Sequence, residues 1–145
     1  MNVLEGSLGF RLARTARSMK RALESRLSEY NITASQYIVL AQLNDEDGIS
    51  LSQLGERLDF DNPTITGVVD RMERDGLVER RRVADDRRVI NVFLTQKGKK
   101  LLTAIEDVAD EINEKAIDKL PKADSEKLVK ILDSIWNKMN ERNVR

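Results

Sequence analysis

The sequence of 145 residues contains no cysteine and no histidine. The lack of cysteine excludes a disulfide framework, a thiolate nucleophile and a cysteine redox sensor. The lack of histidine removes the commonest general base and the commonest zinc ligand. No nucleophile with its base and no glycine-rich phosphate loop can be assembled from the remaining residues. We therefore expect a protein that is not an enzyme and that carries no metal and no cofactor.

Long apolar runs are also missing, because no stretch approaches the roughly 18 consecutive apolar residues of a membrane span. The first residues lack a basic segment followed by a long apolar core, so we expect no secretory signal, no membrane partner and a cytoplasmic location. Aromatic residues make up only 4% of the chain and charged residues 34%. This composition is typical of a helical protein with a large surface rather than of a large β-sandwich.

The formal net charge is zero, but the charges are unevenly distributed along the chain. Residues 11–29 and 76–100 are rich in Lys and Arg, whereas residues 41–75 are rich in Asp and Glu. A zero sum made of opposite blocks favours local contact with a polyanion over a uniformly basic surface. Ordinary solvated surface remains an equal explanation for any one block.

Apolar residues at steps of three and four predict amphipathic helices over much of the chain. The first helix covers about residues 8–30. The second begins after Thr33, which forms a capping box with Gln36. A second capping box, made by Ser50 and Gln53, begins a short third helix.

Asp61 is the expected N-cap of a fourth helix, which has Pro63 in its first turn and Gly76 after its end. The third and fourth helices are joined by residues 59–61 alone, which is the form of a helix-turn-helix. Two longer helices are expected after Thr95, separated by Pro121. Residues 77–95 are rich in β-branched residues and arginine around a turn-forming centre, which predicts a β-hairpin.

The stretch from Leu51 to Gly98, LSQLGERLDFDNPTITGVVDRMERDGLVERRRVADDRRVINVFLTQKG, resembles the MarR family of winged helix-turn-helix transcription regulators, SlyA-like members included. Its most specific part is Asp86 and Arg88, spaced as D-x-R, followed by Leu94, Thr95 and Gly98. The resemblance implies a mainly α fold with a small β-hairpin wing (α+β). Residues 33–99 would form the winged helix-turn-helix DNA-binding domain, and residues 1–32 and 100–145 a helical dimerisation region.

The resemblance implies a sequence-specific regulator that binds double-stranded DNA. We expect a repressor that binds a palindromic operator as a homodimer and is released by a small, anionic aromatic effector. Two alternatives stay open: a non-specific architectural DNA-binding protein, and a winged-helix protein-interaction module without DNA binding.

The fourth helix offers a polar face of Asn, Thr and Arg, types suited to base edges and phosphates in a major groove. Serines near a helix N-terminus suit a phosphate, and arginines at a hairpin tip suit a minor groove. The candidate DNA-binding residues are Ser50, Ser52, Asn62, Pro63, Thr64, Thr66, Arg71, Arg74, Arg82, Arg87 and Arg88. Strand alternation sends Arg81 to the opposite face from Arg80 and Arg82.

Two acidic residues are expected to organise the wing. Asp86 would bond backbone N–H groups of the turn or a neighbouring arginine. By the family's motif spacing, Asp70 would pair with Arg88. Gly67 lies on or near the exposed side of the fourth helix, where relatives often carry a longer polar residue.

The apolar stripes of the first helix and the last two exceed what a small core needs, so a helical dimer interface is expected. Its candidates are Leu8, Leu12, Ile131, Ile135, Trp136 and Met139; the alternative is that these stripes only fill the core of one chain. The effector pocket implied by the resemblance has the candidates Arg14, Arg17, Met19, Tyr30 and Tyr37. The simpler alternative is solvated or phosphate-bound arginines, with Met19 and Tyr37 in the core.

Overall fold

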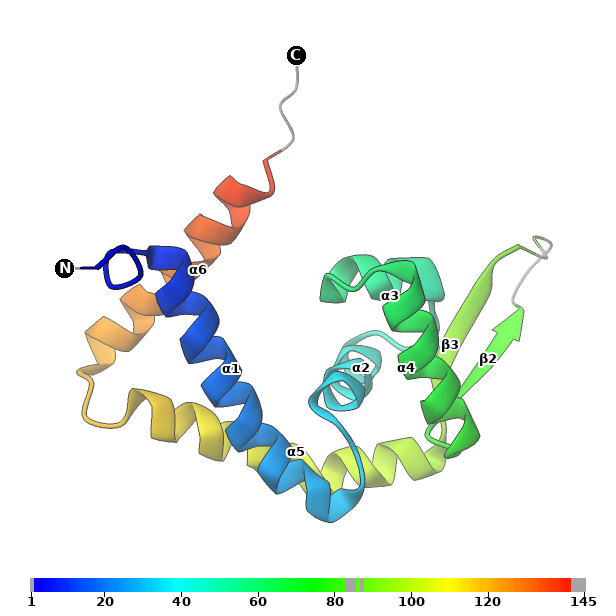
Figure 1. Ribbon diagram of the computed structural model, residues 1–145. Helices are drawn as coiled ribbons and strands as arrows, with labels where there is room; N and C mark the ends of the chain where they lie inside the picture. The colour runs from blue at the N-terminus through cyan, green and yellow to red at the C-terminus, as the bar shows by residue number, and fades with distance from the viewer. Residues whose placement is uncertain (1, 83–85, 87, 142–145) are drawn as a thin grey trace. The chain divides into compact units, whose positions relative to one another are not determined.

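The computed structural model describes residues 2–82, 86 and 88–141, and the chain divides into two units, residues 1–112 and 113–145. Figure 1 shows its helices and its small sheet. In chain order the elements are α1 (Leu8–Leu27), the 3-10 turn η1 (Ser28–Tyr30), α2 (Ala34–Asp45), β1 (Ile49–Ser50), α3 (Leu51–Leu58), α4 (Asn62–Arg74), β2 (Val78–Arg82), β3 (Ile90–Leu94), α5 (Gln96–Ile117) and α6 (Lys122–Met139). The mainly α fold with a small β wing is the predicted one.

The helix starts follow from local hydrogen bonds that the sequence predicted. Thr33 Oγ1 accepts from the backbone N–H of Gln36 at 3.1 Å, and Gln36 Oε1 accepts from the N–H of Thr33 at 3.0 Å. Ser50 and Gln53 form the same reciprocal pair at the start of α3. Each capping box satisfies two N–H groups that the first turn of a helix leaves without a partner. Helices α2 and α3 therefore begin at the residues that the sequence predicted.

Two helix ends differ from the sequence prediction. The first helix ends at Leu27 and tightens into the turn η1, which closes at Asn31 with a φ of 58°. Helix α5 ends at Ile117, three residues before Leu120, and Lys119 takes a φ of 67°. Periodicity alone overestimated both helices. In the first, Tyr30 keeps the apolar spacing although its turn is 3-10, and in α5 the spacing continues to Leu120, past the left-handed Lys119.

The sheet has three strands in the order β1-β3-β2, whereas the sequence predicted only the hairpin of β2 and β3. In the hairpin, Val78 lies opposite Leu94 and Arg82 lies opposite Ile90. The third strand, β1, is only two residues long and pairs Ser50 with Asn91. A strand this short has no periodicity to detect, so only the partner strand defines it.

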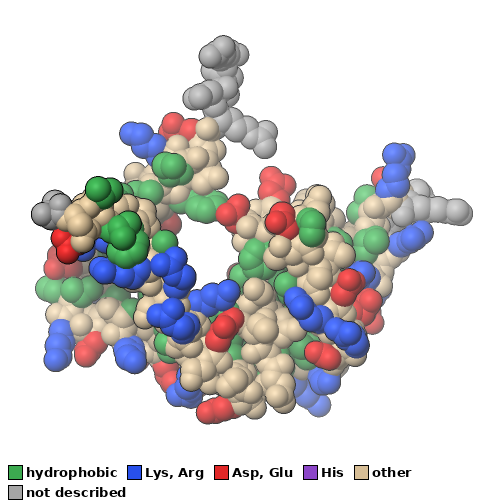
Figure 2. Space-filling view, viewed as in Figure 1, with side chains coloured by type: hydrophobic (Ala, Val, Ile, Leu, Met, Phe, Trp, Pro, Cys, Tyr) green, Lys and Arg blue, Asp and Glu red, His purple; other side chains and the backbone are tan. Residues whose placement is uncertain are grey.

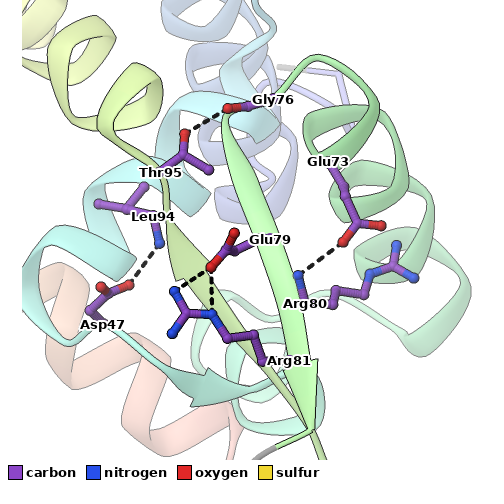
Figure 3. A network of polar contacts seen from close by, with 8 residues as sticks. All are labelled: Asp47, Glu73, Gly76, Glu79, Arg80, Arg81, Leu94 and Thr95. Carbon is purple, nitrogen blue, oxygen red and sulfur yellow. Dashed lines mark hydrogen bonds and ion pairs between the residues drawn. The ribbon is translucent and has the colours of Figure 1, made fainter.

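Polar contacts fix the base of the hairpin to its surroundings (Figure 3). Asp47 Oδ1 accepts a hydrogen bond from the backbone N–H of Leu94 at 2.8 Å. Thr95 Oγ1 donates to the carbonyl of Gly76 at 2.6 Å and accepts from the N–H of Gly98 at 3.1 Å, so one side chain also caps α5. The hairpin is therefore attached to the α2–β1 loop and to the end of α4.

One hydrophobic core holds the first unit together, and its fully buried side chains come from α1 to α5 and the sheet. The largest are Leu27, Leu40, Leu43, Leu54, Ile65, Met72, Ile105, Val39, Val69, Val78 and Val92. In α6, by contrast, no residue is buried. None of the helices that the structure describes combines the length and the apolar character that a membrane span needs.

Two glycines in helices give opposite predictions for the same substitution. A Cβ at Gly67 in α4 would meet no atom within 4 Å, whereas a Cβ at Gly98 in α5 would overlap the backbone carbonyl of Leu77. Gly67→Ala should raise the free energy of unfolding by about 0.5–1 kcal/mol through helix propensity. Gly98→Ala should lower it by roughly 1–3 kcal/mol through overpacking. Urea unfolding of the two variants measures both changes in the free energy of unfolding. Changes of the same sign would contradict this packing.

Candidate DNA-binding surface

The helix-turn-helix is formed by α3 and α4, which a three-residue link joins. Asp59 takes the left-handed conformation, with a φ of 56°, and the N–H of Phe60 donates to the carbonyl of Gly55 at 2.8 Å. A Cβ at Gly55 would lie 3.1 Å from Ile65 Cγ2 and 3.1 Å from the carbonyl oxygen of Phe60. The absent side chain at Gly55 therefore allows α4 to pack closely against α3.

Helix α4 has one buried and one solvent-facing side. Ile65, Val68, Val69 and Met72 are buried in the core, at the helical spacing that the sequence predicted. The remaining face presents the exposed residues Asn62, Pro63, Thr64, Asp70, Arg71 and Arg74 to solvent, with Thr66 half-buried among them. A helix anchored on one side and polar on the other has the character of a groove-reading helix.

A surface hollow of about 300 Å³ lies where the start of α3, the start of α4 and the strand β3 meet. It is lined by Ser50, Leu51, Ser52, Asn62, Thr66, Arg88, Val89 and Ile90. Five of these are predicted DNA-binding residues that the sequence separates by up to 38 positions. The pairing of Ser50 with Asn91 explains why these five residues lie together, because it places the N-terminus of α3 beside the start of β3.

The other predicted DNA-binding residues do not line this hollow. Pro63, Thr64, Arg71 and Arg74 are exposed elsewhere on α4, and Arg82 is exposed at the end of β2. The prediction for Arg87 lies outside the described residues. Figure 2 shows Lys and Arg side chains at the outer end of the hairpin and over α4, interspersed with Asp and Glu. The surface is therefore charged in both signs rather than uniformly basic.

The expected pair of Asp70 and Arg88 is wrong in this structure. Asp70 pairs instead with Arg80 of β2. The backbone N–H of Arg80 also donates to Glu73 at 2.9 Å, so β2 lies along α4 at this point (Figure 3). Family spacing misassigned the partner because it ignores which strand residue faces α4. Strand alternation, which separates Arg80 from Arg81, was the signal that could have suggested it.

Arg81 and Arg88 have different surroundings. Arg81 lies with its guanidinium carbon 4.3 Å from the centre of the Phe93 ring and pairs with Glu79. Arg88 has a side chain that is 95% exposed, and its Nε is 3.7 Å from Asp86 Oδ1. Asp86 Oδ1 also accepts a hydrogen bond from the backbone N–H of Arg88 at 3.0 Å, a contact of the kind expected for a turn-organising aspartate.

The five effector-pocket candidates are distributed over α1, η1 and α2. Tyr30 lines a hollow of about 530 Å³ with Lys97 and Lys100, but the other four candidates do not line it. Arg14 lies 5.3 Å from the centre of the Phe10 ring, Arg17 is exposed and Met19 is half-buried.

Tyr30 and Tyr37 both pack against the core. Burial raises the pKa of Tyr37, and the nearby Asp110 carboxylate raises it further. The simpler alternative placed Met19 and Tyr37 in the core and Arg14 and Arg17 in solvent. Tyr37 and Arg17 have the positions that it describes, whereas Met19 is half-buried and outside the core.

Four of the dimer-interface candidates are exposed in the single chain: Leu8 at 59%, Ile131 at 46%, Trp136 at 52% and Met139 at 78%. Leu12 and Ile135 are half-buried. On α6, Leu128, Ile131, Leu132, Ile135 and Met139 follow the helical spacing of one face. Exposed apolar side chains at helical spacing are of the kind expected for an interface with a partner.

Comparison with known proteins gives consistent matches. A sequence model described as the MarR family matches residues 32–90. The HTH-type transcriptional regulator TtmR of Methylorubrum extorquens strain PA1 is 38% identical over 98 residues, which are 68% of this chain and 50% of TtmR. The HTH-type transcriptional regulator SarZ of Staphylococcus saprophyticus is 30% identical over 77% of this chain and 76% of SarZ.

A solved structure extends the likeness to both units. A mutant of MarR from E. coli, crystallised with operator DNA, matches with a TM-score of 0.82 and 26% identity, over 88% of this chain and 92% of that one. The matched region spans only half the length of TtmR. These relatives are transcriptional regulators and not enzymes, in agreement with the sequence prediction.

The N-cap of α4 gives a pH-dependent prediction. The hydroxyl and the backbone N–H of Thr64 donate to the Asp61 carboxylate, the latter at 2.8 Å, and they hold the pKa of Asp61 below the usual range of aspartate. A lowered pKa adds stability at neutral pH that is lost as pH falls through that pKa. Asp61→Ala should therefore be less stable than the wild type at neutral pH, and the difference should shrink in acid.

Asp61→Asn is the matched control, because asparagine caps a helix about as well as aspartate but does not titrate. Urea unfolding over a pH series should show the wild type losing its cap stability in acid while the Asn variant keeps its own. Parallel pH profiles for all three proteins would contradict the prediction.

Proposed function

The chain belongs to the MarR family of transcription regulators, and from that premise we propose that it binds double-stranded DNA at specific sequences as a homodimer and represses transcription there. Helix α4 is the element that enters the major groove, and the hairpin is the wing beside the adjacent minor groove. Residues 33–99 form the DNA-binding domain in this proposal. Residues 1–32 and 100–145 form the dimerisation region.

One observation carries the proposal: Ser50, Ser52, Asn62, Thr66 and Arg88 come from separate elements and line one hollow. Ser50 and Ser52 lie at the N-terminus of α3, where free N–H groups and the helix dipole favour a phosphate. Asn62 and Thr66 are one turn apart on α4 and are suited to base edges. Arg88 adds a fully charged donor for the backbone or the minor groove.

The remaining candidates extend this surface. Pro63 and Thr64 lie in the first turn of α4, the part that meets base edges, while Arg71 and Arg74 follow along its exposed face. Arg82 supplies a further cation at the outer end of the hairpin. Arg87 remains a candidate that lies outside the described residues. The E. coli relative that was crystallised with operator DNA has the same fold, which supports this assignment.

Two copies are needed because the chain has no net charge. Non-specific attraction to phosphates scales with the number of cations placed on them, so a neutral chain depends on positioned arginines. A symmetric dimer doubles them and sets two copies of α4 one helical turn of DNA apart, which calls for a palindromic operator. The apolar faces of α1 and α6, including Leu8, Leu12, Ile131, Ile135, Trp136 and Met139, form the interface.

Release from DNA is assigned to a small anionic aromatic effector. Arg14 and Arg17 would pair with its carboxylate, and Met19, Tyr30 and Tyr37 would pack against its ring. A thermal-shift screen of small aromatic acids tests this part separately. Binding that leaves DNA affinity unchanged would remove the regulatory role and keep the DNA-binding one.

The function as a whole is tested by selection of bound sites from a random duplex pool. A specific regulator should enrich a palindrome and prefer it to random DNA by roughly 10³-fold or more. A ratio near one would favour the non-specific architectural alternative. No retardation of any duplex at low salt would favour a protein-interaction module.

Arg88→Ala should weaken binding to the selected operator and flatten its salt dependence. Each lost phosphate contact removes about 0.9 from the slope of log K against log salt, so a dimer should lose roughly 1.8. Fluorescence anisotropy over a salt series measures both quantities. An unchanged slope would mean that Arg88 does not contact phosphate.

Met139→Glu should dissociate the dimer. Met139 is 78% exposed in the single chain, so the change should cost the monomer little, whereas a buried unpaired carboxylate in an interface is strongly unfavourable. Asn137→Glu, on the opposite face of α6, is the matched control. Sedimentation equilibrium should give a monomer for the first variant and a dimer for the second; the same mass for both would remove α6 from the interface.

A further inference from the structure

The groove-reading face of α4 carries a carboxylate. Asp70 lies one helical turn after Thr66, which lines the hollow together with Arg88. The Asp70 side chain is 55% exposed. A carboxylate at this place has two unfavourable effects on DNA binding: it repels phosphate, and it attracts any arginine that should contact phosphate.

Arg80 is the ion-pair partner of Asp70 in this structure. The two side chains form an ion pair, and Arg80 is the less exposed partner at 23%. Its position is set by the backbone, because its N–H donates to Glu73 and its residue lies opposite Val92 in the hairpin. Val92 is fully buried. The backbone of Arg80 is thus held beside α4 by contacts other than the ion pair with Asp70.

Arg88 is left available by this arrangement. Its side chain is 95% exposed and lies 3.7 Å from one carboxylate oxygen, Asp86 Oδ1, which already accepts the backbone N–H of Arg88. An exposed pair at this distance contributes little and is easily exchanged for a phosphate. Among the residues that the structure describes, the charged groups around Arg88 therefore compete weakly for its guanidinium as long as Asp70 is neutralised.

We propose that Arg80 is a positioning residue for DNA binding, which neutralises Asp70 and thereby keeps Arg88 free to contact a DNA phosphate. The inference rests on the proposed function. It assigns to β2 a role that differs from a direct contact: Arg80 itself touches no DNA. Without Arg80, Asp70 becomes a free carboxylate one turn from the hollow and recruits Arg88.

The test compares Arg80→Met, Asp70→Asn and the double variant in binding the selected operator over a salt series. Arg80→Met should weaken binding and lower the salt slope by about as much as Arg88→Ala does, roughly 1.8 for a dimer. Asp70→Asn added to Arg80→Met should restore the slope, because no free carboxylate then competes for Arg88. Adding Arg88→Ala to Arg80→Met should lower the slope no further.

Arg81→Met is the matched control. It removes the same charge from the same strand, but Arg81 pairs with Glu79 and lies on the Phe93 ring. Its salt slope should therefore stay close to that of the wild type. Arg80→Lys keeps the charge and should retain most of the slope. It also serves as the second variant if Arg80→Met does not fold, which circular dichroism reveals.

Three outcomes would overturn the inference while leaving DNA binding intact. The first is a salt slope for Arg80→Met equal to that of the wild type, and the second is no recovery of the slope when Asp70→Asn is added. The third is a loss of slope in Arg80→Lys as large as in Arg80→Met. A wild type that binds no duplex would overturn the proposed function and this inference together. Because the wild type is measured in the same series, the two failures are distinguishable.

Discussion

The pairing of β1 with β3 is the contact on which the candidate site depends. It joins two residues, Ser50 and Asn91, that lie far apart in the sequence. Asn91 Nδ2 donates to the carbonyl of Gly48 at 2.9 Å, and the N–H of Gly48 donates to Val92 at 3.0 Å. These hydrogen bonds hold the start of α3 against the wing. Without them the serines of α3 and the arginine of the wing would belong to separate surfaces.

Electrostatics on this surface is a matter of pairing rather than of total charge. Arg80 and Arg81 pair closely with Asp70 and Glu79, whereas Arg88 lies 3.7 Å from Asp86 and is almost fully exposed. Exposed pairs contribute little to stability, but they decide which cations remain available. A chain of zero net charge can therefore present a local site for a polyanion, and its binding should depend strongly on salt.

The two units use apolar side chains differently. In residues 1–112 the apolar residues of the helices and the sheet make a core of ordinary character. On α6 the apolar face is exposed in the single chain, and a contiguous face of this kind usually marks a contact with a partner. Apolar periodicity thus predicts a helix in both units, but it does not predict what packs against the apolar face of that helix. The reason is that the hydrophobic effect does not distinguish the core of one chain from an interface with a partner.

The sequence by itself determined the features that rest on neighbouring residues. The capping boxes at Thr33 and Ser50, the cap at Asp61 and the buried face of α4 need only spacings of three or four. The resemblance to the MarR family, and with it the β-hairpin wing, could be recognised from the continuous stretch Leu51 to Gly98. Tertiary structure decided the third strand, the pairing of Asp70 with Arg80 and the meeting of Ser50, Thr66 and Arg88. These contacts join positions distant in sequence, and local spacing carries no information on which side of a strand meets which turn of a helix.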